Sequence, residues 1–201
     1  MNLFKRFLNP KSDNIQDSSD KEERGKYMPE VKLPTDERFM LNFKNNGGKF
    51  IYCEDENEVL EAFDNILLEN DWYEKDCCCF DENLKSKFGN FNLHFNYSEN
   101  AAFYLSTCEY LIGNDGSILI CSNQIKERKL IELPNSFVIL SSTSQLIDNI
   151  GEGLRGIKFK NKNNIPSNIT TIKNFEPQKE SDFMSYGSSS KDLYLLLLED
   201  L

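Results

Sequence analysis

The sequence predicts an α/β fold with a mostly parallel sheet flanked by helices, preceded by a flexible N-terminal extension. Short apolar runs alternate with helical stripes from Phe39 onward, and the run Leu193–Glu199 is apolar on both faces. A strand with two apolar faces is typical of the centre of a parallel sheet, where both sides are covered. Residues 9–37 have the composition of a linker. We therefore expect one domain over residues 39–201 behind an extension over residues 1–38.

The composition is that of an acidic, mostly globular protein. The chain has 201 residues and a net charge of −10, and its 12% of aromatic residues is too high for a disordered chain. The acidic balance argues against nucleic-acid binding and against broad contact with anionic lipid. The single histidine, His94, leaves almost no material for a histidine metal site or a Ser-His-Asp triad. We expect no cofactor and no metal.

The sequence predicts a cytoplasmic protein that is not an integral membrane protein. No apolar run reaches the roughly 18 residues that a membrane-spanning helix needs, and Met1–Leu8 lacks the apolar core of a secretion signal. Three of the six cysteines are consecutive, at Cys77–Cys79, without the C-x₂-C spacing of common metal sites. We expect buried free thiols; a redox or metal role is the alternative.

The N-terminal extension begins with a short amphipathic segment. Leu3, Phe4, Phe7 and Leu8 fall on one side of a short helix. The segment is a candidate docking peptide for a membrane or a partner; alternatively it packs on its own domain or on a second copy of the chain. The following residues, to about Glu37, are too polar to offset their ordering entropy, so we expect them to be mobile.

The first half of the domain is predicted to alternate strand and helix. Lys49–Cys53 is a short apolar run after two glycines, hence a strand. Asp55 and Glu58 form a plausible capping box for a helix whose apolar stripe is Val59, Leu60, Phe63, Ile66 and Leu67. A strand over Cys77–Phe80, a helix over Glu82–Phe88 and an extended segment over Phe91–Tyr97 follow.

The second half is predicted to contain a hairpin, two further strands and a helix. Tyr110–Ile112 and Ile118–Cys121 flank Asn-Asp-Gly, whose residues tolerate the positive φ of a tight turn. Phe137–Leu140 reads as a buried strand, and Leu193–Glu199 is too short for a typical helix. A helix capped by Thr143 or Ser144 would bury Leu146, Ile147, Ile150, Leu154 and Ile157. The three glycines of this segment, at positions 151, 153 and 156, either permit close packing of the helix or end it early.

Four segments carry a resemblance to a known family: Glu109–Ile120, Arg128–Pro134, Thr143–Gln145 and Leu193–Glu199. In order and spacing, residues 39–201 resemble the LUD domain, the family of lactate utilisation protein C. The resemblance implies a fold like that of the group containing ribose-5-phosphate isomerase, glucosamine-6-phosphate deaminase and the CoA-transferases. It also implies membership of a system that oxidises L-lactate with iron–sulfur partner subunits.

The chain departs from the family pattern in one loop. Pro166–Thr170 lies where the family leads into a Gly-Pro-Ser stretch followed by Thr and Asp, but this chain continues with Thr171–Phe175. A Gly-Pro-Ser loop could offer backbone N–H groups to an anion. The cysteine motifs of the iron–sulfur subunits are absent as well, so we expect this chain to hold no cluster itself.

The hairpin is the best candidate for a ligand site. Gly116 lets a ligand approach the backbone, Ser117 offers a hydroxyl and Asp115 a carboxylate, with Asn114 beside them. Arg128 is an anion-binding fork nearby in the sequence. Such groups suit a carboxylate or a phosphate; the alternative is a purely structural turn.

Two charged residues near the hairpin have competing interpretations. Glu109 is a candidate general base, or else a solvated or salt-bridged residue at a strand end. Arg128 binds the anion, or else pairs with Glu127 or Glu132 on the surface.

The sequence thus leaves three functions open. The first is an accessory, non-catalytic component of an L-lactate oxidation system that works with iron–sulfur subunits. The second is a CoA-transferase-like enzyme, or a binding protein, for a small carboxylate or sugar phosphate. The third is a scaffold or regulator with a degenerate ligand site, docking through its N-terminal segment. A homo-oligomer is compatible with each.

Overall fold

The computed structural model describes residues 33–98, 100–162, 164–175 and 190–200. Its strands are β1 (Lys49–Cys53), β2 (Asp76–Cys78), β3 (His94–Phe95), β4 (Phe103–Thr107), β5 (Tyr110–Ile112), β6 (Ser117–Ile120), β7 (Ser136–Ser142), β8 (Leu146–Ile147), β9 (Thr170–Ile172) and β10 (Asp192–Leu198). Its α-helices are α2 (Thr35–Asn45), α3 (Glu56–Asn70), α4 (Glu82–Lys87), α5 (Ser122–Ile125) and α6 (Ile150–Lys160). Short 3₁₀ turns cover Gly89–Phe91, Leu130–Glu132 and Thr143–Gln145.

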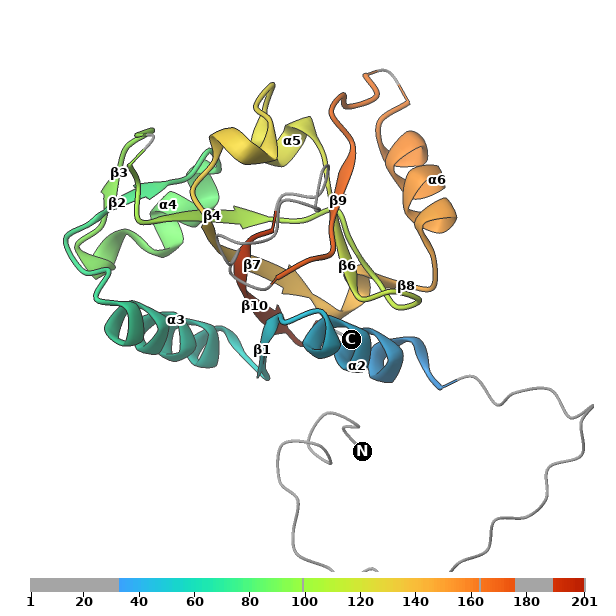
Figure 1. Ribbon diagram of the computed structural model, residues 1–201, viewed down its shortest axis with the longest axis horizontal. Helices are drawn as coiled ribbons and strands as arrows, with labels where there is room; N and C mark the ends of the chain where they lie inside the picture. The colour runs from blue at the N-terminus through green and yellow to red at the C-terminus, as the bar shows by residue number, and fades with distance from the viewer. Residues whose placement is uncertain (1–32, 99, 163, 176–189, 201) are drawn as a thin grey trace, which may run out of the picture. The chain divides into compact units, whose positions relative to one another are not determined.

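The strands form two sheets (Figure 1). The larger has six strands in the order β1-β10-β7-β4-β2-β3, and every neighbouring pair is parallel. The smaller has the order β8-β5-β6-β9, in which β6 pairs antiparallel with both of its neighbours. Helices α3 and α4 contribute to the core of the larger sheet, whereas α6 packs on the smaller one. This architecture confirms the predicted α/β fold with a mostly parallel, helix-flanked sheet.

The predicted strand near the C-terminal end of the sequence is confirmed as β10, which lies inside the larger sheet between β1 and β7. Tyr194 and Leu196 join the core that contains α3 and α4. Leu193, Leu195 and Leu197 alternate with them and are also fully buried. Both faces of the strand are therefore covered, which is why its sequence is a continuous apolar run.

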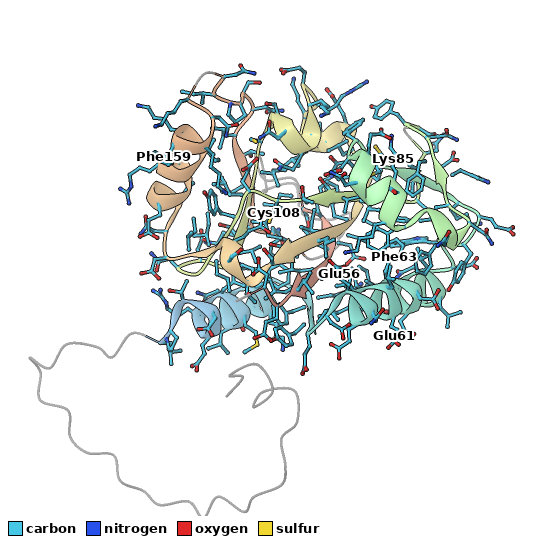
Figure 2. All side chains as sticks on the ribbon, turned by 180° about the vertical axis from the view of Figure 1, so that it is seen from behind. Glu56, Glu61, Phe63, Lys85, Cys108 and Phe159 are labelled. Atoms are coloured by element: carbon cyan, nitrogen blue, oxygen red, sulfur yellow. The ribbon has the colours of Figure 1, made fainter. Side chains whose placement is uncertain are left out.

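Helix α3 follows the predicted pattern at its start and along its buried face. The Asp55 carboxylate accepts hydrogen bonds from the backbone N–H groups of Asn57 (2.7 Å) and Glu58 (3.0 Å). The Glu58 carboxylate reaches back to the N–H of Glu54, one residue before the predicted partner, at 2.7 Å. Four of the five residues in the predicted stripe are buried, and Leu60 is partly buried; Figure 2 labels Phe63 within this core.

The helix predicted to begin at Thr143 or Ser144 is wrong at its start. Thr143–Gln145 form a 3₁₀ turn, and Leu146–Ile147 form β8. Leu146 pairs with Leu111 and Ile147 with Ile112 of β5, so tertiary pairing gives them strand geometry. Helix α6 begins only at Ile150, after an Asn149 cap.

The same helix shows why its glycines are needed. Added Cβ atoms would lie 2.7 Å from the Leu119 side chain at Gly153 and 2.2 Å from the Tyr110 hydroxyl at Gly156. These glycines permit close packing on the smaller sheet, and they do not end the helix, which continues to Lys160. The prediction that Ile150 and Leu154 face inward is wrong, because they are 47% and 43% exposed.

Other differences concern segments with weak local patterns. Helix α2 begins at Thr35, inside the stretch predicted as linker, and β4 and β9 were not predicted. The extended segment over Phe91–Tyr97 is reduced to the two residues of β3. The remainder of the predicted extension, residues 1–32, lies outside the described residues. In the part of the chain that the structure describes, no helix is both long enough and apolar enough to cross a membrane.

Candidate functional site

The predicted hairpin forms between β5 and β6, and helix α2 packs against its turn. The side-chain amide of Asn42 donates to the carbonyl oxygens of Gly113 (3.0 Å) and Asn114 (3.2 Å). The amide of Asn46 donates to the carbonyl of Asp115 at 2.7 Å. Three successive carbonyls of the turn are thus hydrogen-bonded by one helix, which fixes the hairpin to the domain.

The polar side chains of the turn are also engaged. A guanidinium nitrogen of Arg38 donates to the side-chain oxygen of Asn114 at 2.7 Å. One carboxylate oxygen of Asp115 accepts from both the N–H (3.1 Å) and the hydroxyl (2.7 Å) of Ser117. The Lys173 ammonium lies 3.7 Å from the other oxygen. The Asp115 carboxylate and the Ser117 hydroxyl are therefore hydrogen-bonded to each other within the turn.

Gly116 is required here by geometry. Its φ is +67°, and a Cβ atom at this position would lie 2.3 Å from the backbone nitrogen of Phe43 in α2. Its N–H donates to the carbonyl of Ile112 at 2.9 Å. The two N–H groups that an anion would use, those of residues 116 and 117, therefore already have partners, and the space beside the glycine is filled by α2.

Arg128 does not reach the hairpin, because it lies beyond the opposite end of β6. This strand begins directly after Gly116, and α5 follows its far end (Figure 1). The backbone carbonyl of Arg128 accepts a hydrogen bond at 2.6 Å from the side chain of Asn168. Asn168 lies in the segment Pro166–Thr170, where the sequence departs from the family pattern; it has φ +53° and holds the backbone before Arg128 in place.

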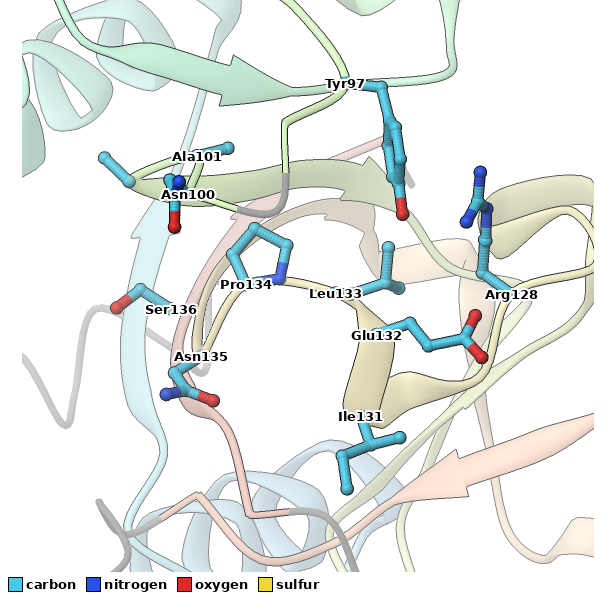
Figure 3. A pocket seen from close by; sticks show the side chains of 11 residues that line it. Tyr97, Asn100, Ala101, Arg128, Ile131, Glu132, Leu133, Pro134, Asn135 and Ser136 are labelled. Atoms are coloured by element: carbon cyan, nitrogen blue, oxygen red, sulfur yellow. The ribbon is translucent and has the colours of Figure 1, made fainter.

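Arg128 instead lines an open pocket of about 830 Å³ (Figure 3). Its guanidinium carbon lies 4.2 Å from the centre of the Tyr97 ring. The residues around the pocket come from the turn before β4 and from the segment that leads into β7; the remaining ones are Asn100, Ala101, Ala102, Ile131, Glu132, Leu133, Pro134, Asn135 and Ser136. The pocket therefore lies where β4 and β7 begin.

Neither predicted surface partner of Arg128 pairs with it. Glu127 accepts a hydrogen bond from the Ser167 hydroxyl at 3.1 Å, and Glu132 accepts from the N–H of Lys129 at 3.2 Å. Among the described residues the guanidinium makes no ion pair and donates no side-chain hydrogen bond. Its flat face is occupied by the Tyr97 ring, and its N–H edge is available to a ligand.

Glu109 is neither solvated nor salt-bridged; it is a buried acceptor behind α5. One carboxylate oxygen accepts from the Asn123 amide (2.9 Å), the Gln124 amide (3.1 Å) and the Cys121 thiol (3.1 Å). Burial alone would raise the pKa of Glu109, but these hydrogen bonds and the nearby Lys160 ammonium lower it overall. An ionised carboxylate with three donors and a lowered pKa is poorly suited to general base catalysis at neutral pH.

A cluster of polar side chains lies at the carboxyl ends of β7 and β10. The sequence analysis did not predict that these residues lie together. The Asp200 carboxylate accepts from the N–H (2.8 Å) and hydroxyl (2.6 Å) of Ser144 and from the Thr143 hydroxyl (2.9 Å). These hydrogen bonds outweigh the effect of burial and lower the pKa of Asp200 to about 2. The sequence pointed to Thr143 and Ser144 only as a possible helix cap and as part of the family pattern, and Asp200 carried no local signal.

Gln145 completes the polar edge of the sheet. Its side-chain nitrogen donates to the carbonyl of Cys108 at 2.6 Å, and its oxygen accepts from the N–H of Ser142 and the hydroxyl of Ser141, each at 2.9 Å. Ligands of parallel α/β proteins usually bind at this edge. Here the polar groups form hydrogen bonds with one another, and these bonds link the ends of β4 and β7.

The six cysteines are free and buried, as predicted. Cys77 and Cys79 point into the core with α3 and α4, whereas Cys78 lies on the other side of β2. Over the described ranges, no group of three or more His, Cys, Asp and Glu side chains is arranged to hold a metal ion.

Comparisons with known proteins agree with the fold. The family model of the LUD domain matches residues 92–198. A crystal structure of a DUF162 family protein from Deinococcus radiodurans superposes with a TM-score of 0.60 and 12% identity, covering 84% of this chain and 100% of that one. At this identity the likeness concerns the fold alone. No curated protein matches the chain.

Proposed function

Because the chain belongs to the LUD domain family, we propose that it is an accessory, non-catalytic component of a system that oxidises L-lactate, working with iron–sulfur subunits. The family match carries this proposal. The closed hairpin supports the non-catalytic part, since the N–H groups of Gly116 and Ser117 and the carboxylate of Glu109 are all engaged inside the protein. The iron–sulfur clusters would be held by the partner subunits.

The test is to delete the gene and to purify the tagged full-length protein from its own cells. We expect the deletion strain to lose L-lactate-dependent oxygen consumption and to regain it with the wild-type gene. We also expect the tagged protein to co-purify with proteins that show iron–sulfur absorption, because an accessory subunit acts within a complex. Unchanged lactate oxidation in the deletion strain, together with a protein that purifies alone, would contradict the proposal.

A second candidate function is the binding of a small carboxylate or phosphate in the Arg128 pocket. The specific observation is the position of the guanidinium, stacked on Tyr97 without an acidic partner among the described residues. Asn100, Asn135 and Ser136 line the same pocket and offer neutral hydrogen-bonding groups. A stacked arginine with a free edge is preorganised for two parallel hydrogen bonds to a carboxylate or phosphate.

We expect Arg128→Ala to weaken anion binding in this pocket by about 1.5–3 kcal/mol, the usual range for hydrogen bonds to charged groups. Calorimetric titration of lactate, a short dicarboxylate and a sugar phosphate against both proteins measures it. The fold should survive, because Arg128 is exposed. Lys129→Ala, which removes a neighbouring charge outside the pocket, is the matched control. Equal affinity in wild type and Arg128→Ala would exclude this site.

A further inference from the structure

The outer side of α6 and the loop after it expose several large apolar side chains. Phe159 is 72% exposed, Ile165 52% and Leu154 43%. Figure 2 shows Phe159 on the outer side of its helix. Ten large hydrophobic side chains are exposed among the described residues, and five of them lie between residues 150 and 169. Such a concentration marks an interaction surface more often than scattered single residues do.

Basic side chains surround these apolar ones. Arg155, Lys158 and Lys162, together with Phe159 and Ile165, line a groove of about 320 Å³. The Lys162 ammonium lies 4.5 Å from the centre of the Phe159 ring. None of the three cations forms an ion pair with a residue that the structure describes. We call these five residues the α6 face.

The charge of this region is opposite to that of the rest of the protein. The stretch from Gly153 to Phe175 contains five basic residues and no acidic one. The whole chain carries −10, so the other residues together carry −15. A negatively charged surface would therefore attract this side and repel the others.

We propose that the α6 face docks on an anionic membrane surface. Phe159 and Ile165 would enter the boundary between headgroups and acyl chains, and the three cations would contact the lipid phosphates. Helices with apolar residues beside lysine and arginine bind membrane interfaces in this way, and each cation near the surface adds to the attraction. This role lies beyond the proposed part in lactate oxidation and does not depend on it.

The residue types favour a membrane over an acidic protein as the partner. Two of the three cations are lysines, whose mobile ammonium groups suit a diffuse negative surface, whereas protein interfaces are depleted in lysine. The Lys162 ammonium lies over the Phe159 ring, and the flexible lysine stem would let it move to the lipid phosphates while the ring inserts. Phe159, the most exposed apolar residue of the α6 face, projects outward, which suits insertion into lipid.

Flotation of the full-length protein with lipid vesicles tests the proposal. We expect binding to vesicles of phosphatidylglycerol and phosphatidylcholine, none to phosphatidylcholine alone, and weaker binding as salt screens the charges. The double variant Lys158→Glu/Lys162→Glu should lose at least about tenfold in affinity, since each charge near the membrane contributes substantially. Lys75→Glu/Lys129→Glu makes the same change in net charge at exposed sites outside the α6 face and should lose much less.

A second pair of variants tests the contribution of the apolar side chains to membrane binding. Phe159→Ala should weaken binding several-fold, whereas Leu68→Ala should not, although Leu68 is 70% exposed on α3. No binding to anionic vesicles would overturn the proposal. Undiminished binding of Lys158→Glu/Lys162→Glu would overturn it too, and would point to another segment such as Leu3–Leu8. Binding to polyglutamate without binding to vesicles would identify the α6 face as a protein-docking surface, and the membrane assignment would be wrong.

Discussion

We expect the free energy of unfolding to fall by about 6 kcal/mol between pH 8 and pH 10. The main cause is that six buried thiols stay protonated in the folded protein while those of the unfolded chain ionise, and one buried lysine offsets part of this loss. Burial raises the pKa of Cys53, Cys108 and Cys121 to about 12 and that of Cys78 and Cys79 to about 11. The pKa of Cys77 is raised for the same reason.

The sign follows from which state binds more protons. Below the ordinary thiol pKa, near 9, both states are protonated and the thiols leave stability unchanged. Above it the unfolded chain loses protons that the folded protein keeps, so stability falls by about 1.4 kcal/mol per thiol and pH unit, or roughly 8 kcal/mol for six thiols at pH 10.

Lys191 acts in the opposite direction. Its side chain is 2% exposed, its ammonium donates to the carbonyls of Leu133 (2.9 Å) and Pro134 (3.0 Å), and burial lowers its pKa to about 8. The folded protein releases this proton before the unfolded chain does, so stability rises between pH 8 and the ordinary lysine pKa. This contribution offsets roughly 2 kcal/mol of the loss.

Urea denaturation under reducing conditions at pH 8, 9 and 10 measures the effect. The fluorescence of Trp72, the one tryptophan of the chain, is a suitable signal because its ring is buried against Phe103 at a centroid distance of 4.6 Å. Cys77→Val serves as the control, since it removes one titrating thiol and should reduce the net fall in stability by about 1.4 kcal/mol, nearly a quarter of it. A stability that stays constant up to pH 10 would contradict the prediction.

The second large effect is expected at the hairpin. We expect Gly116→Val to cost at least about 3 kcal/mol, because positive φ is strained for a β-branched residue and the new side chain would collide with the backbone of α2. The Cβ atom alone would lie 2.3 Å from the nitrogen of Phe43 and 2.4 Å from the carbonyl carbon of Asn42. Main-chain atoms cannot rotate away, so α2 would have to move.

Chemical denaturation of Gly116→Val beside Gly89→Ala measures this cost. An added Cβ at Gly89 meets no atom within 4 Å, so that variant should be close to neutral. A loss of less than 1 kcal/mol in Gly116→Val would mean that α2 does not hold the turn in the way described.

The secondary structure was predictable where the contacts that determine it lie close together in the sequence, and it was not predictable where those contacts are distant. Helix α3 and the strand β1 were predictable because their caps and apolar patterns lie within a few residues. The hairpin was predictable from Asn114, Asp115 and Gly116 for the same reason. Leu146 and Ile147 were placed in a helix because their strand partner, β5, is more than thirty residues away.

The candidate site is a different case, because its residues do not come together. The sequence suggested anion chemistry for all of them, but Arg128 and Gly116 lie beyond opposite ends of β6. A spacing of twelve residues along the sequence carries no information on direction once a strand and a helix intervene. Nor could the sequence reveal that α2, which begins within the predicted linker, supplies the atoms that close the turn.

The place of β10 in the sheet has a consequence for synthesis on the ribosome. Among the strands that the structure describes, β1 pairs only with β10. Lys49 and Asp192, which form an ion pair across these two strands, are 143 residues apart. At about 5–20 residues per second, a nascent chain spends roughly 7–30 seconds with β1 unpaired. During that interval the edge of β1 is open to other chains, and once Ser142 has been made the β10-facing edge of β7 is open as well. Overexpression should therefore favour aggregation of unfinished chains, and a lower expression level or a chaperone that covers strand edges should raise the yield of folded protein.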